Sequence, residues 1–277
     1  MTDTHDTAPT QYVEANGIRF AYRRFGKGGG VPIVFNQHYV GTMDQWDPAV
    51  TDGLAETREV ILFNNAGVSS SSGETPSDFQ AMGTNAIAFI RALGLAQVDI
   101  FGISIGGFVA QEIALQGGDL VRKIVLVGTG HRGQDMAAGR SPQIFAASYD
   151  PPEHLWLAVH FKPTPASQEA GLAFLERRLR RQDRDLAVSD RTAAAQGEAI
   201  GKWVTPDANA LEYLKSIRQP TLIVQGSDDV IIPTNHSLTL QHELPDAQLI
   251  VYPDSGHGSI YQYPELFLTH ATMFLDA

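Results

Sequence analysis

The 277-residue sequence contains no cysteine, which excludes a disulfide framework, a thiolate nucleophile and a cysteine-ligated iron–sulfur site. Basic residues are few relative to acidic ones, because 20 Lys and Arg face 31 Asp and Glu and give a net charge of −11. A charge of that sign argues against nucleic acid or an anionic membrane as the main partner. The proportions of apolar residues (43%) and charged residues (18%) are those of a globular protein.

Long hydrophobic runs are also missing. No stretch approaches the roughly 18 consecutive apolar residues of a membrane span, and residues 1–10 are polar without a basic start. We therefore expect neither a secretory signal nor a membrane partner, and a cytoplasmic location. The motif H-E-x-x-H does not occur and the histidines lack metal-ligand spacing, so no metal site is expected.

Short apolar runs rich in β-branched residues predict eight strands, and most of them alternate with helical stretches. An Asn16-Gly17 turn near the start predicts a hairpin. This alternation is typical of an α/β fold: a mostly parallel eight-stranded sheet with helices on both faces. The expected strands are 11–14, 18–23, 31–36, 59–64, 98–103, 123–127, 221–225 and 248–252.

One long region interrupts this alternation, since no strand is evident between residues 131 and 219. Helices are expected there at 143–148, 153–161, 168–181 and 191–203. We therefore predict a core domain of residues 1–130 and 220–277, with a helical cap (lid) of residues 131–219 inserted into it. The basic run Arg177, Arg178, Arg180 and Arg181 is expected to form a solvated helix face.

The most informative motif lies at residues 98–107, VDIFGISIGG, where Ser104 stands between Gly102 and Gly106. A buried strand is expected to turn sharply into a helix here, with glycine two positions away on either side because larger side chains would clash. Such a turn exposes the serine hydroxyl as a nucleophile. The alternative is a glycine-rich turn whose serine merely caps the helix.

A serine nucleophile needs a base and an acid to orient it. Asp228 and Asp229 follow the predicted strand 221–225, and His257 follows the strand 248–252. Ligand sites in parallel sheets form at the carboxyl ends of strands, so these side chains are expected at one edge. Their order after Ser104 is serine, acid, histidine.

With these motifs the chain resembles, over nearly its whole length, an α/β-hydrolase-fold serine hydrolase of the lid-bearing esterase, lactonase and cofactor-free haloperoxidase type. The acid loop G-x-x-D-x-x-x-P and the S-G-H histidine loop carry the resemblance. It implies a catalytic triad of Ser104, Asp229 and His257, with Asp228 as the competing acid. It implies no cofactor, and it leaves a homo-oligomer open.

The resemblance also implies an oxyanion hole made by the backbone N–H groups of Ile105 and Tyr39. The loop that carries Tyr39 departs from the family pattern, because Gln37-His38 stands where relatives usually have His-Gly. His38 therefore either lines the pocket or is a packed polar residue. A second departure is Asn64-Asn65-Ala66-Gly67, where relatives often carry an acidic residue and an arginine. Further pocket candidates, each of which could instead be core, are His131, Phe145, Trp156, Phe161 and Trp203.

The sequence thus predicts a cofactor-independent hydrolase of a small-molecule carboxylic ester or lactone. The same triad would also serve a carbon–carbon bond hydrolase acting on a diketone, or a perhydrolase or haloperoxidase. A non-catalytic ligand receptor with this fold is the alternative from a different class. The segment 128–133 matches G-x-G-x-x-G, but no helix is expected to begin there, which favours a hinge into the cap over a dinucleotide site.

Overall fold

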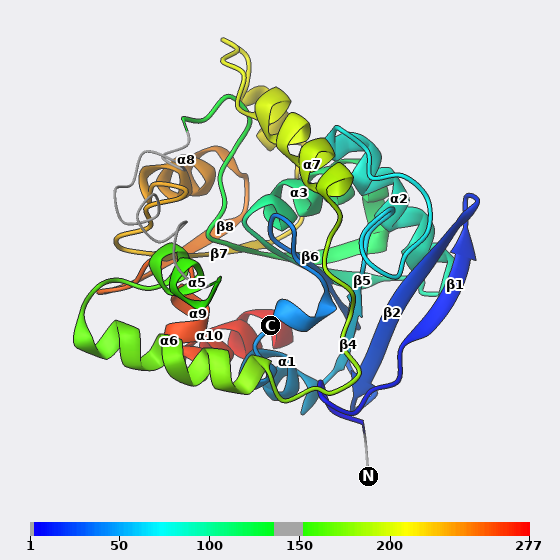
Figure 1. The fold of residues 1–277 in the computed structure, drawn as a ribbon. Helices are drawn as coiled ribbons and strands as arrows, with labels where there is room; N and C mark the ends of the chain where they lie inside the picture. Colours follow the sequence, from blue (N-terminus) through cyan, green and yellow to red (C-terminus); the bar gives the residue numbers. More distant parts are fainter. Residues whose placement is uncertain (1–2, 136–151) are drawn as a thin grey trace.

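The computed structural model describes residues 3–135 and 152–277, with the side chains of residues 152 and 153 left out. Within these ranges the chain forms one eight-stranded sheet, and each strand coincides with a predicted one (Figure 1). The strands are β1 (Gln11–Ala15), β2 (Ile18–Gly26), β3 (Ile33–Asn36), β4 (Glu59–Phe63), β5 (Val98–Ile103), β6 (Val121–Val127), β7 (Thr221–Gly226) and β8 (Ala247–Tyr252).

The strand order is β1-β2-β4-β3-β5-β6-β7-β8. Only the β1–β2 and β2–β4 pairs are antiparallel, and the remaining pairs are parallel. The prediction of a mostly parallel eight-stranded sheet is therefore confirmed. Because β5 lies at the centre, the turn that follows it is flanked by the loops after β3 and β6.

Helices cover both faces of the sheet (Figure 1). Side chains of successive strand residues alternate between two apolar clusters, so that Ile100 packs toward α2 and α3 whereas Phe101 packs toward α1 and α10. This alternation explains why the strands are apolar throughout, since both faces are buried. The helices of the sheet layers are α1 (Pro48–Ala55), α2 (Phe79–Ala92), α3 (Ile105–Gly117), α8 (Asn235–Glu243), α9 (Ser259–Gln262) and α10 (Pro264–Asp276), with short 3₁₀ turns η1 (Met43–Gln45) and η2 (Gly118–Leu120).

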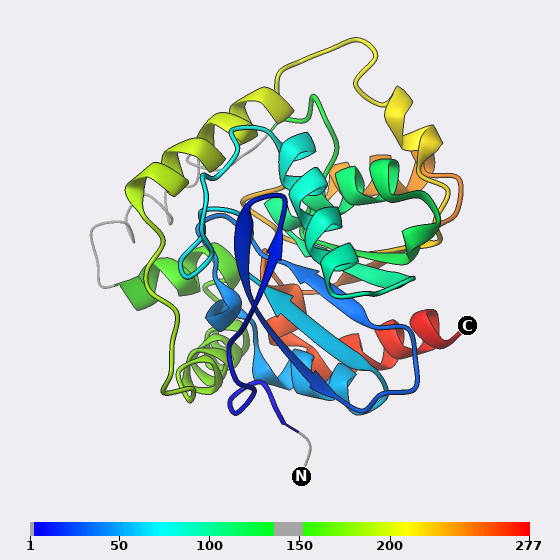
Figure 2. The ribbon, with the colours of Figure 1, turned by 90° about the vertical axis from the view of Figure 1, so that its right-hand side faces the viewer.

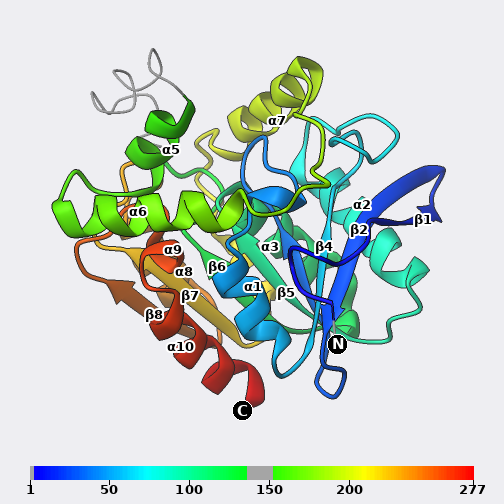
Figure 3. The same cartoon turned by 60° about the horizontal axis from the view of Figure 1, so that its bottom comes forward.

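The chain between β6 and β7 carries the helices α5 (Pro152–His160), α6 (Pro165–Arg178) and α7 (Asp190–Trp203) and the 3₁₀ turn η3 (Glu212–Ser216). Figure 3 shows α6 running across the molecule above α1 and α9, which it contacts. Figure 2 shows α7 along one side, next to the loop after β4, where the Thr192 hydroxyl donates to the Gly67 carbonyl at 2.7 Å. The helix expected at 143–148 lies outside the described residues. Among the helices of the described ranges, none has the length and apolar character needed to cross a bilayer.

The prediction that the basic run is a solvated face is wrong for three of its four arginines. Arg177 makes a two-pronged ion pair with the buried Asp47 at 2.8 and 2.7 Å. The Arg178 guanidinium lies 4.0 Å from the centre of the Trp156 ring, and Arg181 is buried. Only Arg180 is exposed. The acidic and aromatic partners of these arginines come from other segments of the chain, which the helical period does not reveal.

We expect Arg177→Ala to lower the free energy of unfolding by about 2–3 kcal/mol, because it leaves the inaccessible Asp47 carboxylate without its cation. Arg180→Ala is the matched control on the same helix end, and its effect should stay within about 0.5 kcal/mol. Urea unfolding of both variants measures the difference. Equal effects would contradict the assigned burial of the Arg177 pair.

Candidate active site

Ser104 occupies a strained turn between β5 and α3. Its backbone has φ 54° and ψ −126°, a region that L-residues with side chains seldom adopt. The turn is fixed from both sides, because the Ser104 N–H donates to the Val127 carbonyl at 2.9 Å and its carbonyl accepts from the Thr129 hydroxyl at 2.8 Å. The Ser104 hydroxyl makes no capping bond to the fully described helix α3, so the capping interpretation is not supported.

The glycines around Ser104 are required by close backbone approach. A Cβ atom on Gly102 would lie 2.3 Å from the Gly106 carbonyl oxygen, and one on Gly106 would lie 2.0 Å from the Asn36 carbonyl oxygen. Real Cβ contacts are not this short, so any side chain at either position would force the backbone apart. The first turn of α3 is thereby pressed against the loop that leaves β3.

The loops after β7 and β8 hold the acid and the histidine. His257 Nδ1 lies 2.8 Å from Asp229 Oδ2. Asp229 is itself locked in place, since its Oδ1 accepts the backbone N–H groups of Ile231 and Ile232 at 2.8 and 3.0 Å, and Gln225 donates to Oδ2 at 2.9 Å. A carboxylate only accepts hydrogen bonds, so His257 donates from Nδ1 and keeps a lone pair on Nε2.

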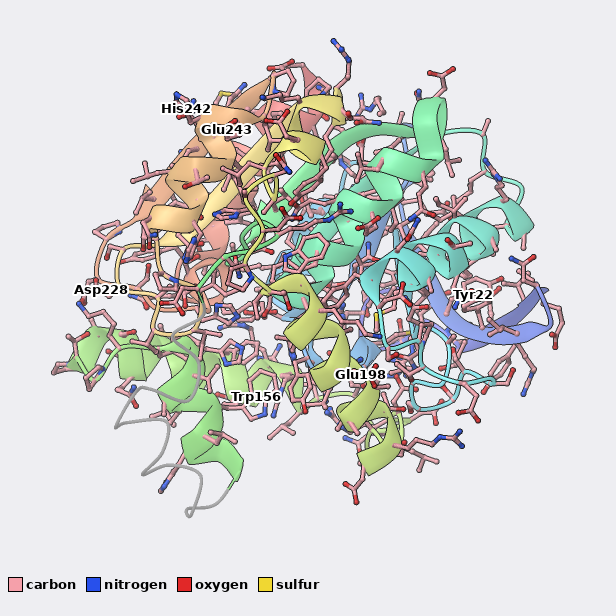
Figure 4. All side chains as sticks on the ribbon, turned by 90° about the horizontal axis from the view of Figure 1, so that it is seen from above. Tyr22, Trp156, Glu198, Asp228, His242 and Glu243 are labelled. Atoms are coloured by element: carbon pink, nitrogen blue, oxygen red, sulfur yellow. The ribbon has the colours of Figure 1, made fainter. Side chains whose placement is uncertain are left out.

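Asp228 points away from this arrangement. Its carboxylate is about half exposed and pairs with Lys162 at 3.0 Å, and Figure 4 shows it near the edge of the molecule. The hydrogen bond from the Ser227 hydroxyl lowers the pKa of the Asp228 carboxyl most, and the contact with Lys162 lowers it further. Of the two candidate acids, only Asp229 contacts the histidine.

Gly128, directly after β6, brings the two halves of the site together. A Cβ atom on Gly128 would lie 3.1 Å from His257 Nδ1, and the preceding Val127 accepts the N–H of Ser104. Val127 thus contacts Ser104 while the adjacent Gly128 lies against His257. Among the described residues no hydrogen bond joins the Ser104 hydroxyl to His257, whose hydrogen bond is to Asp229. The three predicted residues follow the carboxyl ends of β5, β7 and β8 at one edge of the sheet.

The backbone N–H of Tyr39, in the loop after β3, is available as a donor. The His38 N–H donates to the Gln37 side chain at 2.8 Å and the Val40 N–H donates to the Gln196 side chain at 2.8 Å. Between them, the Tyr39 N–H has no acceptor among the described residues. Ile105 begins α3, and an N–H at the first turn of a helix has no partner within that helix.

A small cavity of about 40 Å³ is bordered by Ile105, whereas Tyr39, Ser104 and His257 are not among its lining residues. Ile105, His38 and Gln196 border it, together with apolar side chains from the neighbouring elements. A space of this size holds a few atoms. The remaining lining residues are Asn36, Gln37, Gly41, Phe63, Asn65, Val68, Met82 and Val109.

Three imidazoles lie in a row, beginning with His38, which lines the cavity. The ring centres of His38 and His160 are 5.8 Å apart, as are those of His160 and His257. Burial lowers the pKa of His38 to about 4 and, with the neighbouring histidines, lowers that of His160 well below its usual value. Trp156, labelled in Figure 4, stacks on His160 with ring centres 4.6 Å apart. His38 and His160 are therefore uncharged at neutral pH and place no charge beside His257.

The other described pocket candidates do not border this cavity. His131 Nε2 lies 3.3 Å from His236 Nδ1, Phe161 packs on Phe174, and Trp203 stacks on Phe108 in the core. Phe145 lies outside the described residues. Within the described ranges no group of histidine or acidic side chains is arranged to hold a metal ion.

Sequence reasoning missed two residues, His160 and Gln196, since neither belongs to a motif. His5, near the start of the chain, is buried against the Thr51 hydroxyl. His236, on α8, is also buried.

Residues 31–264 match a family model described as alpha/beta hydrolase fold. A solved alpha/beta hydrolase fold protein from Chitinophaga pinensis is similar to the chain, with a TM-score of 0.92 and 42% identity over 99% of this chain and all of that one.

Two curated proteins are similar along most of their length. Poly(3-hydroxyalkanoate) depolymerase from Ectopseudomonas oleovorans is 28% identical over 253 residues, which cover 90% of this chain and 85% of that protein. The 2-hydroxymuconate semialdehyde hydrolase from Pseudomonas putida is 30% identical over 242 residues, which cover 80% and 78%.

Buried His38 should make stability depend on pH. Its folded pKa of about 4 lies below the roughly 6.5 of an unfolded histidine, so only the unfolded chain takes up this proton between those values. The free energy of unfolding should therefore fall as pH drops, with His38 contributing about 1.2 kcal/mol per pH unit near pH 5.

We expect His38→Gln to reduce that slope in urea unfolding at several pH values. The control His242→Gln removes an exposed imidazole and should keep the wild-type slope; equal slopes in both variants would contradict the assignment.

Proposed function

Because the chain belongs to the alpha/beta hydrolase family, we propose that it is a serine hydrolase that cleaves a carboxylic ester, lactones included, through an acyl-enzyme on Ser104. The observation that carries this proposal is the strained Ser104 turn beside the His257–Asp229 hydrogen bond. Such a turn holds a hydroxyl clear of the sheet, where a base can reach it.

In this mechanism His257 Nε2 takes the proton of Ser104 as the hydroxyl oxygen attacks the carbonyl carbon. The same nitrogen then returns the proton to the leaving alcohol. In the second half of the reaction, His257 takes a proton from a water molecule as that water attacks the acyl-enzyme, and the proton then passes to the Ser104 oxygen as the acid leaves. Asp229 fixes the tautomer of His257 and stabilises the imidazolium. Its own carboxylate is supported by two backbone N–H groups, so it does not have to move during the reaction.

The negative charge on the attacked oxygen is accepted by the N–H groups of Ile105 and Tyr39. Support comes from the side-chain bonds that occupy the N–H groups on both sides of Tyr39, which leave its donor as the one available in that loop segment. Removing one oxyanion-hole donor typically costs about 10²–10³ in kcat.

A carbon–carbon bond hydrolase is the second candidate, favoured by the relative named 2-hydroxymuconate semialdehyde hydrolase. The name of the other curated relative, a depolymerase of poly(3-hydroxyalkanoate), favours ester cleavage. The turnover rates of p-nitrophenyl esters and lactones, compared with the rate of cleavage of a diketone, distinguish the two activities. We expect the esters or lactones to be the better substrates.

Ser104→Ala should abolish ester turnover, with a loss of at least about 10⁴-fold, and leave the thermal midpoint nearly unchanged. A fluorophosphonate probe should label the wild type and the control Ser227→Ala, whose hydroxyl lies on the exposed acid loop, but not Ser104→Ala. An unlabelled wild type would favour the non-catalytic receptor, and labelling of Ser104→Ala would place the nucleophile elsewhere.

Asp229→Asn should lower kcat by about 10⁴-fold, by analogy with other triads. The amide oxygen would stay with the N–H groups of Ile231 and Ile232, so the NH2 group would face His257, donate to Nδ1 and select the unproductive tautomer. The neighbouring Asp228→Asn should change kcat by no more than a few-fold, since that side chain contacts Lys162 instead. Steady-state kinetics on one ester suffices for both variants. A larger loss of kcat in Asp228→Asn than in Asp229→Asn would show that Asp228 is the catalytic acid.

A further inference from the structure

We propose that Gln196 of α7 is a positioning residue that sets the oxyanion loop, defined here as residues 37–41, so that the cap segment completes the catalytic site. This inference rests on the proposed function, because it assigns a role to a residue acting through the Tyr39 N–H. Gln196 touches no reacting atom in this proposal.

The contact is specific and buried. Gln196 Oε1 accepts the Val40 N–H at 2.8 Å, and the Gln196 side chain is almost inaccessible and borders the cavity next to Ile105. On the same helix, the Ala193 carbonyl accepts the Tyr39 hydroxyl at 3.2 Å. Two consecutive residues of the oxyanion loop are thus bonded to one helix that lies more than 150 positions further along the chain.

The loop needs this support because its backbone is strained. Val40 has φ 50°, and a β-branched residue with positive φ is a rare outlier that costs about 1–3 kcal/mol. Such a conformation persists only where neighbouring contacts fix it. The Gln196 bond holds the N–H of Val40 itself, so it fixes the peptide that follows Tyr39.

The Gln37–His38 peptide is fixed in a similar way. Gln37 accepts the His38 N–H through its Oε1 and donates to the Thr42 carbonyl at 3.0 Å through its Nε2. The His38–Tyr39 peptide, which carries the Tyr39 N–H, therefore lies between two peptides whose N–H groups are each bonded to a carboxamide. Losing the Gln196 bond would free the Val40 peptide and let the Tyr39 N–H turn away from the place proposed for the oxyanion.

The helix α7 is itself fixed to the rest of the fold, so it can hold the oxyanion loop in position. The Thr192 hydroxyl donates to Gly67, and the Thr192 N–H is capped by Ser189 at 3.2 Å. Lys202, at the other end, donates to the Ser77 carbonyl at 2.9 Å. The contacts of Thr192 with Gly67 and of Lys202 with Ser77 are separate from Gln196, so they keep the helix in place when that side chain is changed.

The test compares Gln196→Met, which keeps the length but lacks the acceptor, with Gln196→Glu, which keeps an acceptor oxygen at the same reach. We expect Gln196→Met to lower kcat for an ester about ten- to hundred-fold with little change in KM. Affinity for a trifluoromethyl ketone, which forms a tetrahedral oxyanion on the nucleophile, should fall by the same factor. Gln196→Glu should restore most of both quantities. The control Glu198→Gln alters the exposed outer side of α7 (Figure 4) and should behave as wild type.

Should Gln196→Met not fold, Gln196→Asn replaces it, because its shorter amide stays polar but does not reach Val40. The proposal is overturned if the Met or Asn variant keeps wild-type kcat and ketone affinity, or if Gln196→Glu is as impaired as they are. It is also overturned if KM rises while ketone affinity stays unchanged. Failure of the proposed function is seen separately, as a wild type that neither turns over esters nor is labelled at Ser104.

Discussion

The candidate site depends on crowding of the backbone around Ser104. Gly102 faces the Gly106 carbonyl and Gly106 faces the Asn36 carbonyl at separations that leave no room for a methyl group. This one packing arrangement places the serine hydroxyl, the first N–H of α3 and the loop after β3 together. Because the contacts are between backbones, their positions do not depend on flexible side chains. A strained serine is stable here because the surrounding strands fix both of its neighbours.

The acid and the histidine are joined by the same kind of contact. A Cβ atom on Gly226 would lie 2.1 Å from the Gly256 carbonyl oxygen, and the Asp228 N–H donates to the Ser255 carbonyl at 2.9 Å. The pairing of β7 with β8 brings Gly226 opposite Tyr252, so the two strands end at the same level and the loops that follow them lie side by side. The strand order and register therefore determine how far apart Asp229 and His257 lie, and the glycines allow the two loops to approach each other.

The strands and the catalytic motifs could be predicted because their signals are local. An apolar run of four to nine residues, or a glycine two positions from a serine, is visible in the sequence alone. The partners of Arg177 and Val40 could not be predicted, since Asp47 and Gln196 lie about 130 and 156 positions away. Neither contact follows a repeat or a motif. The histidines show the same limit: burial of His5 and His160 depends on which segments pack over them, and spacing along the chain does not encode this.

The second departure from the family pattern has a structural counterpart of this long-range kind. Asn64, in the loop after β4, donates to Asp185 at 2.9 Å, and Asp185 also accepts from Ser70 and lies near the buried Arg23. Arg23 pairs with Asp44 in turn. Buried charges are costly unless paired, so this network holds the segment before α7 in one position. The alignment of α7, and with it of the residues that contact the oxyanion loop, therefore depends on a paired ionic network in addition to apolar packing.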